Sequence, residues 1–172
     1  TTAAACDYAT LSAVYSQMAS IYDTHQLFSE ERNCLRLSSR YAWQAGDTLY
    51  SIIDLRRIGG CYIITGQLDS AEICLLNAQE LYHRYGYVQE GLVATTPLMQ
   101  LYVDDGRLTE AKLLMEKFEA EFKKFGPNHE LPPNQRIYYR YKGRYYEKTG
   151  QLDSAEYYYR KMYSPEMNHT AQ

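Results

Sequence analysis

Apolar side chains recur along the chain in steps of three and four residues. The clearest run consists of Leu68, Ala71, Leu75, Ala78 and Tyr82. Runs with the same spacing start at Leu108 and at Leu152, and similar runs precede each of the three. This spacing places the apolar side chains on one face of an α-helix. The pattern therefore predicts pairs of amphipathic helices and almost no strand.

The same eight letters, TGQLDSAE, occur at residues 65–72 and again at 149–156. Three series of identical residues, which we call ladders, recur along the chain in steps of 40 or 44 residues. They are Gly66, Gly106, Gly150; Tyr22, Tyr62, Tyr102, Tyr146; and Gly46, Gly86, Gly126. A period of this size indicates a repeat architecture. We expect each repeat to hold two helices, A and B, joined by a turn in which glycine takes the left-handed conformation. Asp69 would place its charge at the positive end of a helix B.

The repeats cover residues 7–46, 47–86, 87–130 and 131–172, which we interpret as a single array over 1–172. The first repeat departs from the pattern, with Gln26 at the turn glycine and Glu31 at a small alanine. Pro97 predicts that the third helix A is kinked near residues 93–96, or starts late with Thr95 or Thr96 as its cap. The segment 125–135 holds three prolines and the only insertion in the ladder, and predicts an extended linker.

Composition and charge argue against several classes of function. The net charge of −3 disfavours nucleic acid as a partner, and no apolar run is long enough to span a membrane. We find no phosphate loop, and the four histidines are scattered without ligand spacing, so we expect no enzyme activity, no cofactor and no metal. The cysteines Cys6, Cys34, Cys61 and Cys74 predict small buried side chains, with a Cys61–Cys74 disulfide as the alternative. A chain without an initiator Met is expected to be a piece of a longer protein.

Tyrosine is unusually frequent, with 19 residues, and gathers between residues 137 and 163 among Arg and Lys. Such interleaving could stack on nucleic acid bases. A core interpretation is favoured, because Tyr139, Tyr146 and Tyr159 fall on repeat core positions. In the last helix, consecutive tyrosines at 157–159 point to different faces. We expect a following helix of the parent chain, or a second copy of this chain, to pack there.

The repeat pattern resembles the tetratricopeptide repeat. The second repeat carries the match at Leu55, Ile58, Gly59, Tyr62, Gly66, Ala71, Leu75 and Ala78, and the fourth at Tyr139, Gly143, Tyr146, Gly150, Ala155 and Tyr159. The period is longer than the usual 34 residues of that family. In this respect the chain is similar to the long-unit arrays of bacterial membrane-linked sensors and transcriptional regulators. The resemblance implies an all-α fold, a right-handed α-solenoid of about four antiparallel helix pairs.

The resemblance also implies a function: a non-catalytic scaffold that binds a peptide or partner domain on the concave helix-A surface. The alternative is a ligand-sensing region of a larger bacterial regulator, on the periplasmic or the cytoplasmic side of the membrane. The matching contact positions are Gln17, Ser20, Arg56, Arg57, Gly60, Gln100, Asp104, Arg140, Tyr141, Arg144 and Lys148. Arg140, Arg144 and Lys148 step by four, and with Arg56 would form a basic strip for an acidic segment or a C-terminal carboxylate. The alternative is a solvated face that pairs with Glu147 or its neighbours.

Overall fold

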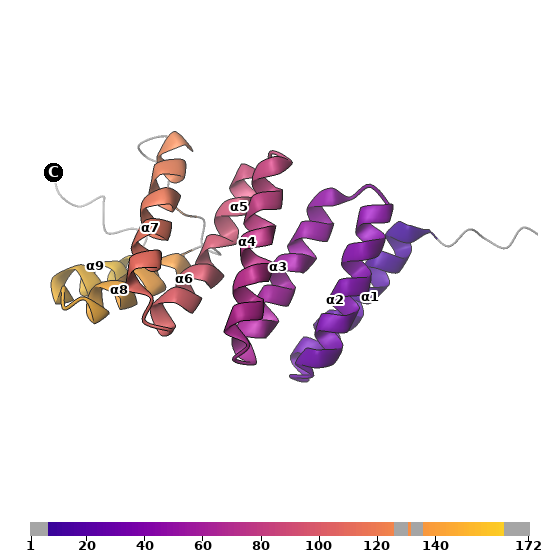
Figure 1. Cartoon of the computed structure of the whole chain (residues 1–172), viewed down its shortest axis with the longest axis horizontal. Coiled ribbons are helices and arrows are strands. Elements are labelled where there is room, and N and C mark those ends of the chain that lie inside the picture. The colour runs from indigo at the N-terminus through magenta and orange to yellow at the C-terminus, as the bar shows by residue number, and fades with distance from the viewer. Residues whose placement is uncertain (1–6, 126–130, 132–135, 164–172) are drawn as a thin grey trace, which may run out of the picture. The chain divides into compact units, whose positions relative to one another are not determined.

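The computed structural model describes residues 7–125, 131 and 136–163, and within them the chain is helical without any strand (Figure 1). The predicted all-α helical array is confirmed. The elements are α1 (Tyr8–Thr24), α2 (Phe28–Gln44), α3 (Thr48–Ile64), α4 (Leu68–Arg84), α5 (Val88–Val93), α6 (Thr95–Asp104), α7 (Leu108–Phe122), the 3-10 turn η1 (Lys123–Phe125), α8 (Ile137–Lys148) and α9 (Leu152–Tyr163).

The chain forms two compact units, Thr1–Ala94 and Thr95–Gln172, which we describe separately. In the first unit each helix packs against the next one along the chain, from α1 to α5. In the second unit α6 packs against both α7 and α8, and α8 packs against α9. The boundary between the units falls inside the third predicted repeat, and the division into four repeats stays a prediction.

The turns between helices are built as the glycine ladder predicts. At Gly66 the φ angle is +73°, the Gly66 amide donates to the Ile63 carbonyl at 3.0 Å, and the Gln67 amide donates to the Tyr62 carbonyl at 2.9 Å. Left-handed glycines recur at Gly46, Gly86, Gly106 and Gly150, while Gly126 lies outside the described residues. Gln26 adopts the same conformation, with φ +57°, although it carries a side chain. The repeat therefore imposes this turn even where the favourable residue is missing.

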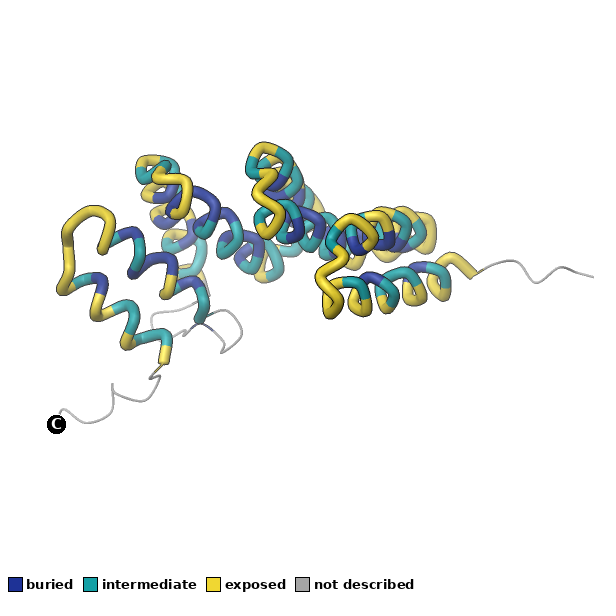
Figure 2. The backbone as a smooth tube through the Cα atoms, turned by 90° about the horizontal axis from the view of Figure 1, so that it is seen from below, coloured by how far each residue is buried: buried dark blue, intermediate teal, exposed yellow. Residues whose placement is uncertain are grey.

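Most predicted core positions of helices α4 and α7 are buried, while Leu68, Leu108 and Phe122 at the helix ends are half-buried; Figure 2 shows the buried face of each helix. The buried side chains are Ala71, Leu75, Ala78 and Tyr82 in α4, and Ala111, Met115 and Phe118 in α7. Helix α9 departs from this pattern. Of its predicted apolar face only Ala155 is buried, and Leu152 is 66% exposed. The main packing partner of α9 is α8.

The expected interruption near Pro97 is present. Helix α5 ends at Val93 and α6 begins at Thr95, so Thr95 is the first residue of the new helix rather than its cap. Pro97 explains the position of the break, because it has no amide hydrogen to bond the carbonyl four residues earlier and its ring crowds that carbonyl. The predicted linker over 125–135 lies outside the described residues, apart from Phe125 at the end of η1 and the buried Leu131.

Cys34, Cys61 and Cys74 are free thiols, so the alternative of a Cys61–Cys74 disulfide is wrong. Cys34 and Cys61 are buried in one cluster of the first unit, together with Ala19, Leu35 and Ile58. The pKa of Cys61 is raised to about 12, mainly by burial and secondly by a hydrogen bond with the Glu31 carboxylate. These two thiols therefore serve as small core side chains, as predicted, while Cys6 lies outside the described residues.

Candidate functional site

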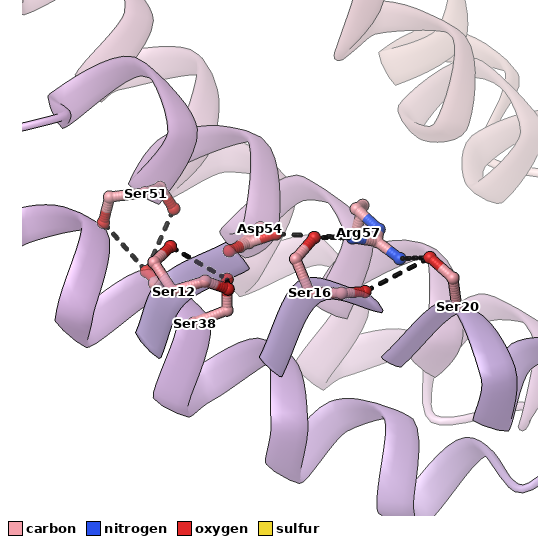
Figure 3. A network of polar contacts seen from close by, with 8 residues as sticks. Ser12, Ser16, Ser20, Ser38, Ser51, Asp54 and Arg57 are labelled. Carbon is pink, nitrogen blue, oxygen red and sulfur yellow. Dashed lines mark hydrogen bonds and ion pairs between the residues drawn. The ribbon is translucent and has the colours of Figure 1, made fainter. Parts of the chain in front are cut away.

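The first unit brings the candidate residue Arg57 to the boundary between two A helices. Arg57 belongs to α3, and its Nη1 donates to Ser16 Oγ of α1 at 3.1 Å. Its Nη2 donates to Ser20 Oγ at 3.3 Å, so one guanidinium group bridges two successive turns of α1 (Figure 3). The serines at 12, 16 and 20 share one face of α1 because they are four residues apart. Arg57 thus fixes neighbouring A helices to each other.

A buried carboxylate lies beneath this bridge. Asp54, one turn before Arg57, is completely buried, and its Oδ1 lies 3.5 Å from Arg57 Nη1. Burial raises the pKa of Asp54, although Ser38 and Arg57 act in the opposite direction. Ser38 in turn lies 3.3 Å from Ser12, Oγ to Oγ, which extends the polar network from α3 through α2 to α1 (Figure 3). The spacing of these residues along the chain does not reveal this network.

Glu31 is the second buried carboxylate of the unit, with only 4% of its surface exposed. It stands in the first turn of α2, at the position where the resemblance predicts alanine. The positive end of the helix favours a carboxylate there. Burial raises the pKa of Glu31, and the neighbouring charge of Asp23 acts in the same direction, while Cys61, Arg57 and Arg32 oppose the shift.

These two carboxyls predict an unusual pH dependence of stability. Their pKa values in the folded protein are raised above the ordinary values of 3.8 and 4.5. The folded state therefore binds protons more tightly than the unfolded chain in the window just above those values. Their contribution to stability is largest in acid and decreases as the pH rises through the raised pKa values. Asp54→Asn should flatten this decrease.

Urea unfolding between about pH 4 and pH 8 measures the effect. The fluorescence of Trp43, the single tryptophan of the chain, reports on the first unit. The free energy of unfolding of the wild-type protein, relative to that of Asp54→Asn, should fall as the pH rises. An increase over the same window would show that Asp54 has no raised pKa.

A pocket of about 280 Å3 opens beside the bridge, between α1, the end of α2 and the start of α3. Nine residues line it: Ala9, Ser12, Ala13, Ser16, Gln17, Ala42, Ala45, Asp47 and Tyr50. Ser12 and Ala42 are buried and form its floor. The exposed lining residues form its rim: Ala9, Ala13, Gln17, Ala45, Asp47 and Tyr50. The predicted contact residue Gln17 is therefore part of a recess and not of a flat surface.

Arg56 contacts a different part of the unit from Arg57. Burial raises the pKa of Tyr82, a core residue of α4, and a hydrogen bond with Arg56 acts against that rise. Arg56 Nε is itself buried and without a hydrogen-bond partner among the described residues. Arg56 therefore contacts the core of the first unit. Because α8 belongs to the second unit, the basic strip that Arg56 was expected to form with α8 stays a prediction.

In the second unit, some of the predicted contact residues on α8 are exposed, and others are buried or paired with neighbouring side chains. Arg140 and Lys148 are exposed. Arg144 forms an ion pair with Asp104 of α6 at 2.7 Å, which is a structural pairing of two predicted contact residues. Tyr141 is only 8% exposed, so its ring is part of the core and is not presented to a partner. Gln100 is half-buried on α6.

Lys142 is a buried cation on α8 that was not among the predicted contact residues. It pairs with Glu119 of α7 and lies 4.2 Å from the ring centre of Tyr158. Burial lowers the pKa of Lys142, but hydrogen bonds with Glu119 and Tyr158 outweigh it, so the pKa is raised. Tyr158 also stacks on Tyr139 and on Tyr146, at 6.0 and 5.5 Å between ring centres. The tyrosine-rich stretch is thus packed around its own cation, which favours the core interpretation.

Across the described ranges we find no group of three or more His, Cys, Asp or Glu side chains arranged to hold a metal ion. The helices within these ranges also lack the combination of length and apolar character that crossing a membrane requires.

Comparison with known proteins establishes similarity of fold only. No protein-family model matches the chain, and no curated protein matches it. Among solved structures, the crystal structure of BtubC (BKLC) from P. vanneervenii is similar, with a TM-score of 0.74 and 16% sequence identity. The alignment covers 99% of this chain and 72% of that chain. The similarity agrees with an all-α helical array.

Proposed function

We propose that this chain is a non-catalytic interaction scaffold, which binds a peptide segment of a partner protein on its helix-A surface. The observation that carries the proposal is the pocket beside Gln17. It lies between helices that Arg57 holds in place through Ser16 and Ser20. When a side chain enters a recess whose walls are already fixed, little conformational entropy of the protein is lost on binding.

The repeats are proposed to be of the tetratricopeptide type, wound into a right-handed solenoid. Close packing at the family's small position supports this. A Cβ atom on Gly59 would lie 2.7 Å from Leu75, and one on Gly143 would lie 2.7 Å from Tyr159. Both contacts join a helix A to its own helix B, as the matching motif requires. The period of about 40 residues is the basis for placing the array in a bacterial membrane-linked regulator, on its periplasmic or its cytoplasmic side.

For the second unit we propose an acidic or C-terminal carboxylate segment as the partner. Arg140 and Lys148 are exposed on α8 and eight residues apart, so they lie on the same side of the helix. Arg144 between them already pairs with Asp104. The two exposed cations are therefore the ones available to attract a carboxylate.

A ligand-sensing region is the alternative function. A small-molecule site usually encloses most of its ligand in a largely apolar cavity. The pocket in the first unit is instead open, and its exposed rim includes the polar and charged side chains of Gln17, Asp47 and Tyr50. This geometry favours a side chain that arrives with a peptide.

Selection from a displayed random peptide library against the whole chain tests the scaffold. We expect enriched peptides that bind with dissociation constants in the micromolar range. Acidic members should lose about tenfold or more in affinity on the double variant Arg140→Glu, Lys148→Glu. The matched control is Lys112→Glu, Lys117→Glu, which makes the same charge change at exposed positions of α7.

Equal loss in both double variants would mean that only the net charge matters, and would reject the α8 surface. Failure to enrich any peptide over an unselected pool would reject the scaffold itself.

A further inference from the structure

The charge around the pocket of the first unit indicates what enters it. Asp47 is the only charged residue among the nine that line the pocket. Arg57 donates to Ser16 of the lining, and its charge is offset by Asp54 at 3.5 Å. A guest with a positive charge would therefore meet one carboxylate and no uncompensated cation.

The end of α2 adds to this preference. Ala42 and Ala45 line the pocket at the helix C-terminus, where the helix dipole favours a cation. The last turn of α2 carries no basic residue, whereas the last turn of the equivalent α4 carries His83 and Arg84. The first repeat thus lacks the cation that the second repeat supplies from its own chain.

We propose that this pocket binds the side chain of a lysine in the partner peptide, an inference that rests on the proposed scaffold function. The small side chains of Ala9 and Ala13 leave room along α1 for the four methylene groups of lysine. The ammonium group would reach the Asp47 carboxylate and the Ser12 hydroxyl of the floor. The ring of Tyr50, 45% exposed at the rim, offers a face for a cation–π contact.

Lysine suits the pocket better than arginine. A guanidinium group pairs best with a carboxylate that offers both oxygens. In Asp47, Oδ1 already accepts the Tyr50 amide at 3.0 Å as the N-cap of α3. One oxygen remains for a guest, and a compact ammonium group needs no more than one.

The test uses two amino acid derivatives as probes, with both backbone ends blocked so that neither end is charged. N-acetyl-lysine-N-methylamide is titrated into the 15N-labelled chain, with the norleucine analogue as a control that keeps the carbon chain and lacks the ammonium group. We expect saturable shifts of amides lining the pocket, with a dissociation constant in the millimolar range, and binding of norleucine at least tenfold weaker.

Three variants locate the site. Ala13→Leu fills the pocket from the exposed side of α1 and should abolish the saturable shifts, whereas Ala120→Leu, at an exposed position of α7, should leave them unchanged. Asp47→Asn keeps an N-cap residue and removes the charge, so it should weaken binding at least threefold. The Trp43 fluorescence melt of each variant checks that the first unit is folded.

Equal binding of lysine and norleucine would overturn the inference, as would lysine shifts that persist in Ala13→Leu. The same holds for an absence of saturable shifts in the wild-type chain.

The library selection separates this inference from the scaffold proposal. If enriched peptides keep their affinity when every lysine is replaced by norleucine, the lysine pocket is wrong and the scaffold stands. If no peptide is enriched while the lysine probe still binds in the pocket, the scaffold is wrong and the chemistry of the pocket stands.

Discussion

Gly59→Ala should lower the free energy of unfolding of the first unit by about 2 kcal/mol, because an added methyl overfills the contact with α4. Its Cβ would lie 2.7 Å from Leu75 Cγ and 2.8 Å from Cδ2. Leu75 is fully buried, so a shift of its side chain displaces other core atoms. Gly60→Ala, at the next residue, should instead raise the free energy of unfolding by up to about 1 kcal/mol, since alanine is the better helix former.

The two variants form a matched pair. A Cβ on Gly60 meets no atom within 4 Å, so the variants differ in packing and share the same chemical change. Urea unfolding followed by Trp43 fluorescence compares them. A Gly59→Ala variant that is as stable as the Gly60→Ala variant would show that α3 and α4 are not closely packed at Gly59.

Arg57→Met should destabilise the first unit by about 3 kcal/mol near neutral pH. The substitution keeps an apolar stem of similar length and removes the charge next to Asp54. That carboxylate is completely buried, and its Oδ2 has no hydrogen-bond partner among the described residues. The loss should therefore come from the uncompensated charge rather than from the missing contacts with Ser16 and Ser20.

The double variant Arg57→Met, Asp54→Asn separates these two causes. If the buried charge dominates, the double variant should recover about 2 kcal/mol of the loss, because an amide costs less to bury than a carboxylate. The same urea titration measures this recovery. A double variant no more stable than Arg57→Met alone would assign the loss to the serine hydrogen bonds.

The architecture was accessible from the sequence because it repeats. Glycine at a left-handed turn and alanine at a close helix contact are demanded by backbone geometry, so they recur at a constant period. Gln26 shows the limit of this reasoning. It replaces a glycine and still takes a φ of +57°, so the neighbouring packing, which the local sequence does not reveal, decides its conformation.

The candidate site was less accessible. Asp54 and the serines of α1 have the spacing of a solvated helix face, and only the pairing of α1 with α3 shows that they are enclosed. Tyr141 was assigned to the surface because the repeat register placed Tyr139 and Tyr146 in the core. Tyr139, Tyr146 and Tyr159 are in fact only half-buried, and the buried tyrosines of α8 are Tyr138, Tyr141 and Tyr145. Their steps of three and four are a helical pattern that could have been recognised.

Because each helix of the first unit packs mainly against the next one along the chain, its contacts are short in sequence. Topologies of this kind fold quickly, since little loop entropy is lost before the first contacts form. On the ribosome, α1 and α2 can pair as soon as both have left the exit tunnel, and every later helix adds to a surface that already exists. The unit can thus acquire its order at the speed of translation, because the partners of each new helix, such as Ser16 and Ser20 for Arg57, precede it in the chain.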